Sequence, residues 1–269
     1  MQGAPAGRSG RAVAASLADM ESLPPVAGPP VFLVAPGELT TPVLTLSGPE
    51  GHHAAAVRRL RPGERADVSD GAGTLAEGVV TGVGKDTVTL EIRATRSVPA
   101  PQPRLVVAQA LPKGDRGELA VELMTEVGVD AVVPWSAERS ITKWQGDRGQ
   151  RALGKWRATA REAAKQSRRG WLPEIAELAS TAVLAKRVTA AARAIVLEAD
   201  AEAKLHELAL PEAGDILLIV GPEGGISQAE RAALLEAGAV AARLGPTVLR
   251  TSTAAAAAAA VLLSRTGRW

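Results

Sequence analysis

Apolar residues in the first third of the chain occur in short runs or alternate with polar ones, and turn residues separate the runs. Four segments have this strand pattern: 31–34, 43–46, 75–83 and 87–92. Residues 52–60 have helical spacing instead, and Asp70-Gly71 has the composition of a hairpin turn. Residues 31–98 are therefore predicted to form a small antiparallel β-barrel.

A proline-rich segment, P-A-P-Q-P at 99–103, separates this region from one with a longer period. Apolar runs typical of strands follow at 105–110, 131–133, 194–197, 216–220 and 240–244. Helical patterns occur at 115–127, 153–167, 228–237 and 252–264. The expected core face of the first helix consists of Leu119, Leu123, Met124 and Val127, and Gly128 is its expected end. Because strands that alternate with helices form parallel sheets, residues 104–269 are predicted to be an α/β domain.

The chain of 269 residues is long enough for two domains with separate cores. Its apolar runs are shorter than the roughly 18 residues of a membrane span, so we expect no membrane partner. Cysteine is absent, which excludes disulfides and a thiolate nucleophile and fits a cytoplasmic protein. With three histidines and no cysteine, no metal is expected. Residues 1–30 are expected to be disordered, with Met20 as the natural start.

Positive charge is concentrated in two places although the net charge is only +2. Between Glu138 and Arg169 there are ten basic and three acidic residues, a local excess of seven. A smaller cluster consists of Arg58, Arg59, Arg61 and Arg65, beside His52 and His53. Such clusters indicate either a polyanionic partner or a solvated helix face, and composition alone leaves both interpretations open.

The apolar run at 217–220 is followed by the glycine-rich turn G-P-E-G-G at 221–225. Glycines at a turn let the backbone approach a ligand closely, although a plain tight turn has the same composition. Ser227 and Glu230 have the spacing of a capping box, which predicts a helix start. A second irregular segment, L-G-P-T-V-L-R-T at 244–251, leads into the last helix with Thr251 or Ser252 as the expected cap. Two such loops after neighbouring strands predict a pocket for a nucleotide-like ligand.

The two loops together resemble those of the SPOUT superfamily of S-adenosylmethionine-dependent RNA methyltransferases. Within it, the chain resembles the 16S ribosomal RNA (uracil-N3)-methyltransferases over residues 31–265. The motifs that carry this likeness are G-P-E-G-G-I-S-x-x-E, L-G-x-x-V-L-R-T, G-H-H at 51–53, L-P-K-G-D-R at 111–116, E-R-S at 138–140 and E-A-A-K-Q-S-R-R at 162–169. One departure is Ser252, where members of the family often carry an acidic residue.

The resemblance implies a PUA-like RNA-binding barrel over 31–98 and a SPOUT domain over 104–269, with a deep trefoil knot at about 217–265. General topology rules disfavour knots, so this expectation depends on the resemblance alone. It further implies a homodimer through the knotted domain, and 16S rRNA of the small ribosomal subunit as the partner.

S-adenosylmethionine is the implied cofactor, bound in a bent form between three loops. The implied cofactor-binding residues are Leu197, Glu198, Gly221, Pro222, Glu223, Gly224, Gly225, Ile226, Leu244, Gly245, Val248, Leu249, Arg250 and Thr251. Transfer to N3 of uracil requires loss of the N3 proton and stabilisation of the developing anion. Arg250 suits the second task because its guanidinium has a fixed charge and donor geometry. Glu223 is the candidate to accept or relay the proton, the alternative being that it stabilises its loop.

N3 faces the partner base in a duplex, so the target uridine must be unpaired or flipped out. The candidates for RNA contacts are His52, His53, Arg58, Arg59, Arg139, Gln166, Arg168 and Arg169. Two other functions remain possible from the sequence: a ribose 2′-O-methyltransferase of the same fold, and a non-catalytic RNA-binding assembly factor.

Overall fold

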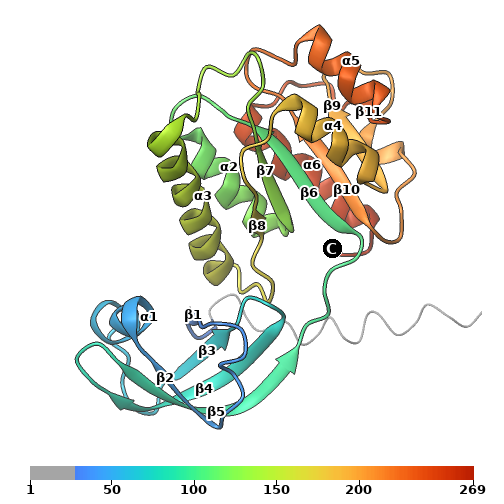
Figure 1. Cartoon of the computed structure of the whole chain (residues 1–269). Helices are drawn as coiled ribbons and strands as arrows, with labels where there is room; N and C mark the ends of the chain where they lie inside the picture. Colours follow the sequence, from blue (N-terminus) through green and yellow to red (C-terminus); the bar gives the residue numbers. More distant parts are fainter. Residues whose placement is uncertain (1–27) are drawn as a thin grey trace, which may run out of the picture.

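The structure is a computed structural model that describes residues 28–269. The expected disorder of residues 1–30 and the proposed start at Met20 therefore lie almost entirely outside the described residues. An N-terminal β domain and a larger C-terminal α/β domain are joined by the segment 98–103 (Figure 1). The change of hydrophobic period near residue 100 thus marks the change of architecture.

Five strands form the sheet of the N-terminal domain in the order β1-β3-β4-β5-β2. Their bounds are β1 Val31–Leu33, β2 Val43–Leu46, β3 Arg65–Ser69, β4 Thr74–Val83 and β5 Val88–Ser97. The prediction of a wholly antiparallel barrel is wrong at β1, which runs parallel to β3 with Phe32 opposite Val68. The reason is connectivity: the chain visits β2 at the opposite edge before it returns to β3, so no hairpin joins β1 to β3.

The helical segment of this domain begins earlier than its sequence pattern predicts. Helix α1 spans Gly48–His52 and continues into a π-helical turn, His53–Val57. Phe32, Leu46, Val68 and Leu90 lie in the core beneath it and are fully or almost fully buried.

Six parallel strands form the sheet of the C-terminal domain in the order β11-β9-β10-β6-β7-β8. Their bounds are β6 Arg104–Ala110, β7 Ala131–Trp135, β8 Glu174–Ile175, β9 Arg193–Leu197, β10 Asp215–Val220 and β11 Val240–Ala242. All five strands predicted for this domain are confirmed. The central strands β6 and β10 are buried on both faces, which explains their continuous apolar sequences.

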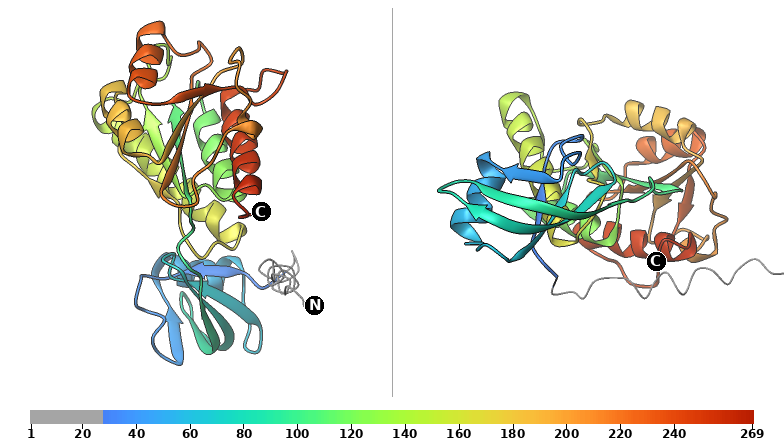
Figure 2. Two further views of the ribbon diagram at one scale, coloured as in Figure 1. Left: turned by 90° about the vertical axis from the view of Figure 1, so that its right-hand side faces the viewer. Right: turned by 90° about the horizontal axis from the view of Figure 1, so that it is seen from below.

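Helices cover both faces of this sheet, as the left view of Figure 2 shows. Helices α2 Arg116–Val127, α3 Gly146–Gln166 and α6 Thr251–Arg265 contribute to the core on one face, and α4 Thr181–Ala190 and α5 Gln228–Glu236 to that on the other. Gly128 ends α2 in the left-handed conformation with φ 102°, as predicted.

The buried face of α2 differs from the predicted one. Leu119 is exposed, whereas Gly117, Val121 and Met124 are buried. The cause is Trp156 of α3: a Cβ at Gly117 would lie 2.7 Å from its indole nitrogen. The two helices approach closely at Gly117, so a residue with a side chain would not fit at this position.

The two domains meet along α3 and the segment that follows it. Glu50 of α1 accepts hydrogen bonds from Arg161 and Lys165 of α3, both at 3.2 Å. Backbone bonds join Gly73 to Gly170 and Leu172 to Gly71. Part of the positive charge of the basic helix is therefore used to hold the N-terminal domain in place.

Candidate functional site

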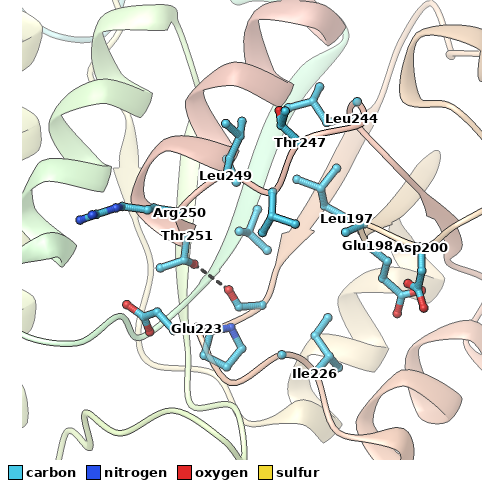
Figure 3. A pocket seen from close by; sticks show the side chains of 18 of the residues that line it. Leu197, Glu198, Asp200, Glu223, Ile226, Leu244, Thr247, Leu249, Arg250 and Thr251 are labelled. Carbon is cyan, nitrogen blue, oxygen red and sulfur yellow. Dashed lines mark hydrogen bonds between the residues drawn. The ribbon is translucent and has the colours of Figure 1, made fainter.

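Three loops at the carboxyl ends of β9, β10 and β11 enclose a cleft of about 610 Å³ (Figure 3). In parallel α/β sheets this edge is where ligands bind, because the loops after adjacent strands diverge there and leave a crevice. The volume lies in the range of small-molecule sites.

Thirteen of the fourteen predicted cofactor-binding residues line this cleft, and their role as ligands stays a prediction. The exception is Gly224, whose backbone packs against Arg139 of the loop after β7. Further lining residues that the sequence analysis missed are Ala199, Asp200, Val220, Arg231, Thr247 and Ala254. Ala199, Val220 and Thr247 adjoin predicted residues in sequence, whereas Arg231 lies on α5 and gave no sequence signal.

The loop after β10 has its shape because of glycine and a capped helix. A Cβ on Gly221 would lie 2.7 Å from Cγ1 of Ile226, so only glycine fits where the loop folds back. Gly225 has φ +75°, a conformation that favours glycine. The predicted capping box of Ser227 and Glu230 is confirmed. Glu230 also accepts hydrogen bonds from the Glu138 amide, and the loop is thereby tied to the one after β7.

Thr251 is not the N-cap of α6, and the alternative cap Ser252 lies one residue further into the helix. Arg250 occupies the N-cap position of α6 and makes no side-chain cap bond. The Thr251 hydroxyl donates instead to the carbonyl oxygen of Gly221 at 2.6 Å. The same hydroxyl accepts a hydrogen bond from Nε2 of Gln109 at 3.0 Å. Thr251 therefore joins the loop after β10 to the start of α6.

Glu223 and Arg250 lie at the same end of the cleft, beside Thr251 (Figure 3). Glu223 accepts a hydrogen bond from the Lys113 amide at 3.2 Å, and Nη1 of Arg116 is 3.8 Å away. Arg250 is exposed, as is the whole segment 246–250. In that segment Val248 is 83% exposed, which is unusual for an apolar side chain beside a cleft.

The opposite end of the cleft is acidic, with Glu198 and Asp200 close together in Figure 3. Both oxygens of Glu198 accept from Nε of Arg231, at 2.9 and 3.0 Å. The carboxylate of Glu198 is thus held in a fixed position. The cleft combines an apolar wall, one end with Glu198, Asp200 and Arg231, and another end with Glu223 and Arg250.

A second, smaller cleft of about 130 Å³ lies where the N-terminal domain meets α3. It brings together four of the predicted RNA-contact residues: His53, Arg58, Gln166 and Arg168. His52 is outside this cleft and pairs with Asp86 at 2.8 Å. Arg139 lies elsewhere, with Nη1 3.3 Å from the carbonyl oxygen of Gly224 beside the larger cleft. Four of the predicted residues therefore share the second cleft and Arg139 adjoins the first, whereas His52 and Arg59 line neither.

Arg169 does not lie on the basic surface that its sequence position suggests. Its guanidinium points inward and donates to Asp130 and to the carbonyl oxygens of Thr125 and Val129. Burial lowers the pKa of Arg169 to about 10, against the opposing effect of Asp130. Its charge is used inside the protein, so the prediction of an RNA contact by Arg169 has no geometric support.

Arg168 has mixed surroundings. It has a positive φ of 55° and donates to Asp67 and to the carbonyl oxygen of Pro29. Burial raises the pKa of Asp67, against the opposing effects of Arg168 and Arg65. Arg168 therefore lines the second cleft while it is held by a partly buried carboxylate.

Two further expectations concern the described part of the chain. Residues 28–269 contain no group of three acidic or histidine side chains placed to hold a metal ion. Within the same residues, no helix has the length and hydropathy needed to cross a bilayer.

Comparison with known proteins gives this architecture a class. The model of an RNA methyltransferase domain matches residues 99–263, and that of an RNA methyltransferase PUA domain matches residues 46–93. The α/β domain with its cleft is thus an RNA methyltransferase domain, preceded by a PUA domain. The predicted fold class and enzyme class are confirmed.

Relatives identify the family within this class. The chain is 47% identical over 234 residues to ribosomal RNA small subunit methyltransferase E of Mycobacterium tuberculosis (strain CDC 1551 / Oshkosh), covering 86% of this chain and 89% of the relative. It is 30% identical over 224 residues to the Bacillus subtilis (strain 168) protein of the same name, covering 79% and 86%. The chain belongs to the ribosomal RNA small subunit methyltransferase E family.

A solved structure agrees with this assignment. The crystal structure of ribosomal RNA small subunit methyltransferase E from Neisseria gonorrhoeae, bound to S-adenosyl methionine, superposes with a TM-score of 0.77 at 26% identity. The match covers 88% of this chain and 98% of that one. It therefore extends over both domains.

Proposed function

We propose that this protein transfers the methyl group of S-adenosylmethionine to N3 of one uridine of 16S rRNA in the small ribosomal subunit. The observation that carries the proposal is the cleft at the carboxyl ends of β9, β10 and β11, which is lined by the residues that the family motifs single out. Work on ribosomal RNA would place the protein in the cytoplasm.

The composition of the cleft suits S-adenosylmethionine. Leu197, Leu244 and Leu249 offer apolar surface to an adenine ring. Glu198 and Asp200 offer acceptors for hydroxyl or ammonium groups. When bound, the cofactor supplies an electrophilic methyl group on a sulfonium, so the protein's main contribution is alignment of the acceptor.

Arg250 and Glu223 are the proposed catalytic residues. The Arg250 guanidinium would stabilise the imide anion that develops as the N3 proton leaves, because it holds a fixed charge at the mouth of the cleft. Glu223 would accept or relay that proton. Its hydrogen bond from the Lys113 amide also supports the alternative, that Glu223 stabilises its loop.

RNA would be held along two surfaces. Arg139 adjoins the cofactor cleft, so it is suited to the phosphates near the target uridine. His52, His53, Arg58, Arg59, Gln166 and Arg168 would bind RNA further away, at the domain junction and the basic helix. Binding through such cations weakens steeply with salt because counterions are released. RNA affinity that does not change between about 50 and 200 mM salt would contradict this part of the proposal.

A homodimer and a knot at about residues 217–265 remain part of the proposal. Exposed apolar side chains beside the cleft, Val248 at 83% and Leu249 at 37%, support contact with a second copy of the chain. Sedimentation of the purified protein tests this. A monomer at micromolar concentration would contradict the dimer.

The decisive experiment maps methylation on small-subunit RNA from a strain that lacks the gene. The expected result is that one uridine lacks its N3 methyl group. Primer extension detects this as the loss of a polymerase stop, because N3 methylation blocks base pairing. A missing ribose 2′-O-methyl would instead indicate the other reaction. Unchanged RNA, together with absence of S-adenosylmethionine binding in calorimetry, would indicate a non-catalytic assembly factor.

The purified protein allows a matched test of Arg250. Arg250→Gln is expected to lower methyl transfer at saturating substrates by about a hundredfold, in the range for loss of one transition-state donor. Its fold should be unaffected because the side chain is exposed. Arg187→Gln, which removes an exposed arginine of α4 that does not line the cleft, is the control. Equal activity of the two variants would contradict the role of Arg250.

A further inference from the structure

Gln109 is a polar residue at an apolar position. Leu105, Val107 and Leu111 alternate with their neighbours along β6 and its end, and all three are buried in the core formed with α2 and α6. Gln109 lies in the same alternation and is 0% exposed. Burial of an amide is unfavourable unless hydrogen bonds compensate for the lost water, so the presence of glutamine here needs an explanation.

The amide of Gln109 forms a hydrogen-bonded series that ends at the cleft. Nε2 donates to the carbonyl oxygen of Ala110 and to the Thr251 hydroxyl, both at 3.0 Å. The hydroxyl in turn donates to the Gly221 carbonyl oxygen at 2.6 Å. The directions of these bonds follow from the atoms involved. The single hydroxyl hydrogen of Thr251 points to the Gly221 carbonyl oxygen, and the Ala110 carbonyl oxygen can only accept, so Nε2 of Gln109 is the donor in both of its bonds.

The amide is incompletely satisfied. Oε1 of Gln109 has no hydrogen-bond partner among residues 28–269. An apolar side chain of the same length would avoid this defect and extend the surrounding core. Stability alone therefore does not account for glutamine at this position.

We propose that Gln109 is a positioning residue for the cofactor cleft, acting through Thr251 on the Gly221 carbonyl and on the first turn of α6. This inference rests on the proposed function. Gly221 and Arg250 belong to two different loops of the cleft, and Thr251 is bonded to the first and adjacent to the second. Gln109 fixes the hydroxyl from below, so the two loops keep one relative position in which the cofactor fits.

The test uses the full-length protein and calorimetry with S-adenosylmethionine in the absence of RNA. Gln109→Met removes the donor and keeps the length and volume of the side chain. It is expected to unfold at the same temperature as the wild type or higher, and to bind S-adenosylmethionine about tenfold more weakly, equal to about 1.4 kcal/mol. In the methyl-transfer assay the KM for S-adenosylmethionine should rise by a similar factor while the KM for RNA stays unchanged.

Variants of Thr251 examine the second link. Thr251→Val should weaken binding as Gln109→Met does, and Thr251→Ser should restore affinity to within about twofold of the wild type. The double variant Gln109→Met/Thr251→Val should bind S-adenosylmethionine about as tightly as whichever single variant has the lower affinity, because both substitutions break the same series of hydrogen bonds. Thr125→Val is the matched control: it removes another buried threonine hydroxyl, which donates to the carbonyl oxygen of Val121 in α2 at 2.7 Å.

Three results would overturn the inference. The first is that Gln109→Met binds S-adenosylmethionine as tightly as the wild type, and the second is that the effects of the two substitutions add in the double variant. The third is that Gln109→Met loses affinity only because it unfolds more easily, and that Thr125→Val loses affinity to the same extent. If the wild-type protein itself fails to bind S-adenosylmethionine, the proposed function falls first and the inference with it. Wild-type binding with unchanged variants refutes only the inference.

Discussion

Substitution of Glu230 by glutamine replaces one oxygen atom by an NH₂ group, yet it should destabilise the protein considerably. Glu230 is 6% exposed and is the acidic member of the capping box of α5. One carboxylate oxygen accepts from the Glu138 amide at 2.8 Å and from the Thr181 hydroxyl at 2.9 Å. The other accepts from the Ser227 amide at 3.2 Å and from its hydroxyl at 3.1 Å. One side chain therefore joins three separate segments around the cleft.

The magnitude follows from these four bonds. Glutamine keeps one acceptor oxygen and places an NH₂ group against two donors, so two hydrogen bonds to a charged group are lost, at about 1.5–3 kcal/mol each. Rotation of a hydroxyl to accept from the NH₂ group, and the easier burial of a neutral amide, offset part of that loss. The net expectation is a decrease of about 2–3 kcal/mol in the free energy of unfolding, or about 4–12 °C in Tm for a chain of this size.

Thermal and urea unfolding of Glu230→Gln measure this effect. Glu174→Gln is the control, because Glu174 makes a single ion pair with Arg104 at 2.6 Å and its side chain is 59% exposed. The control should stay within about 0.5 kcal/mol of the wild type, as exposed pairs do. A Tm of Glu230→Gln no lower than that of Glu174→Gln would show that the hydrogen bonds of Glu230 do not hold the loops together.

Three further changes have calculable directions. Glu50→Gln removes one of the two carboxylates that face the buried Lys165, while Glu162 stays 3.2 Å from its Nζ. The domain junction should weaken by about 1.5–3 kcal/mol, the range for a lost hydrogen bond to a charged group, and urea unfolding should begin earlier; an unshifted transition contradicts it. Burial raises the pKa of Asp67, so the native state binds this proton more tightly than the unfolded state does. The stability of the wild type relative to Asp67→Asn should therefore fall as the pH rises above about 4. Parallel stability–pH profiles of the two proteins would exclude this linkage. Gly221→Ala should weaken S-adenosylmethionine binding at least tenfold, because the added Cβ would lie 2.7 Å from Cγ1 of Ile226. Gly224→Ala, outside the cleft lining, should have a smaller effect, and equal affinities of the two variants would exclude the tight turn as the cause.

The parts of the fold that the sequence predicted are those with strong local signals. Central strands such as β6 and β10 have uninterrupted apolar runs because both their faces are covered. The start of α5 has a complete capping box, and Gly128 ends α2. Each of these signals is contained in fewer than about ten residues, so the pattern determines the element without knowledge of the rest of the chain.

Three features that the sequence did not show depend on the strand length or on the rest of the fold. Strand β8 consists of two residues, which is too short for a periodic pattern. The parallel pairing of β1 with β3 depends on where β2 lies. Arg169 follows a basic helix, so its sequence position suggests a surface residue, yet its guanidinium donates to Asp130, 39 positions away, and is buried. For β1 and Arg169 the missing information is the identity of a partner distant in sequence, whereas for β8 the strand itself is too short to give a signal.

Two sets of buried polar side chains lie at opposite edges of the parallel sheet and have different partners. At the amino edge, Asp130 binds Arg268 at 2.6 Å and the Leu105 amide at 2.8 Å, and so anchors the end of the chain to the first strand of the domain. At the carboxyl edge, Gln109 and Thr251 join loops that enclose the cleft. Asp130 therefore holds the chain end to the sheet, whereas Gln109 and Thr251 hold two loops of the ligand cleft. Because strand boundaries follow from the apolar runs, the unusual position of Gln109 within L-V-V-A-Q-A-L was detectable in the sequence, although its partner Thr251 was not.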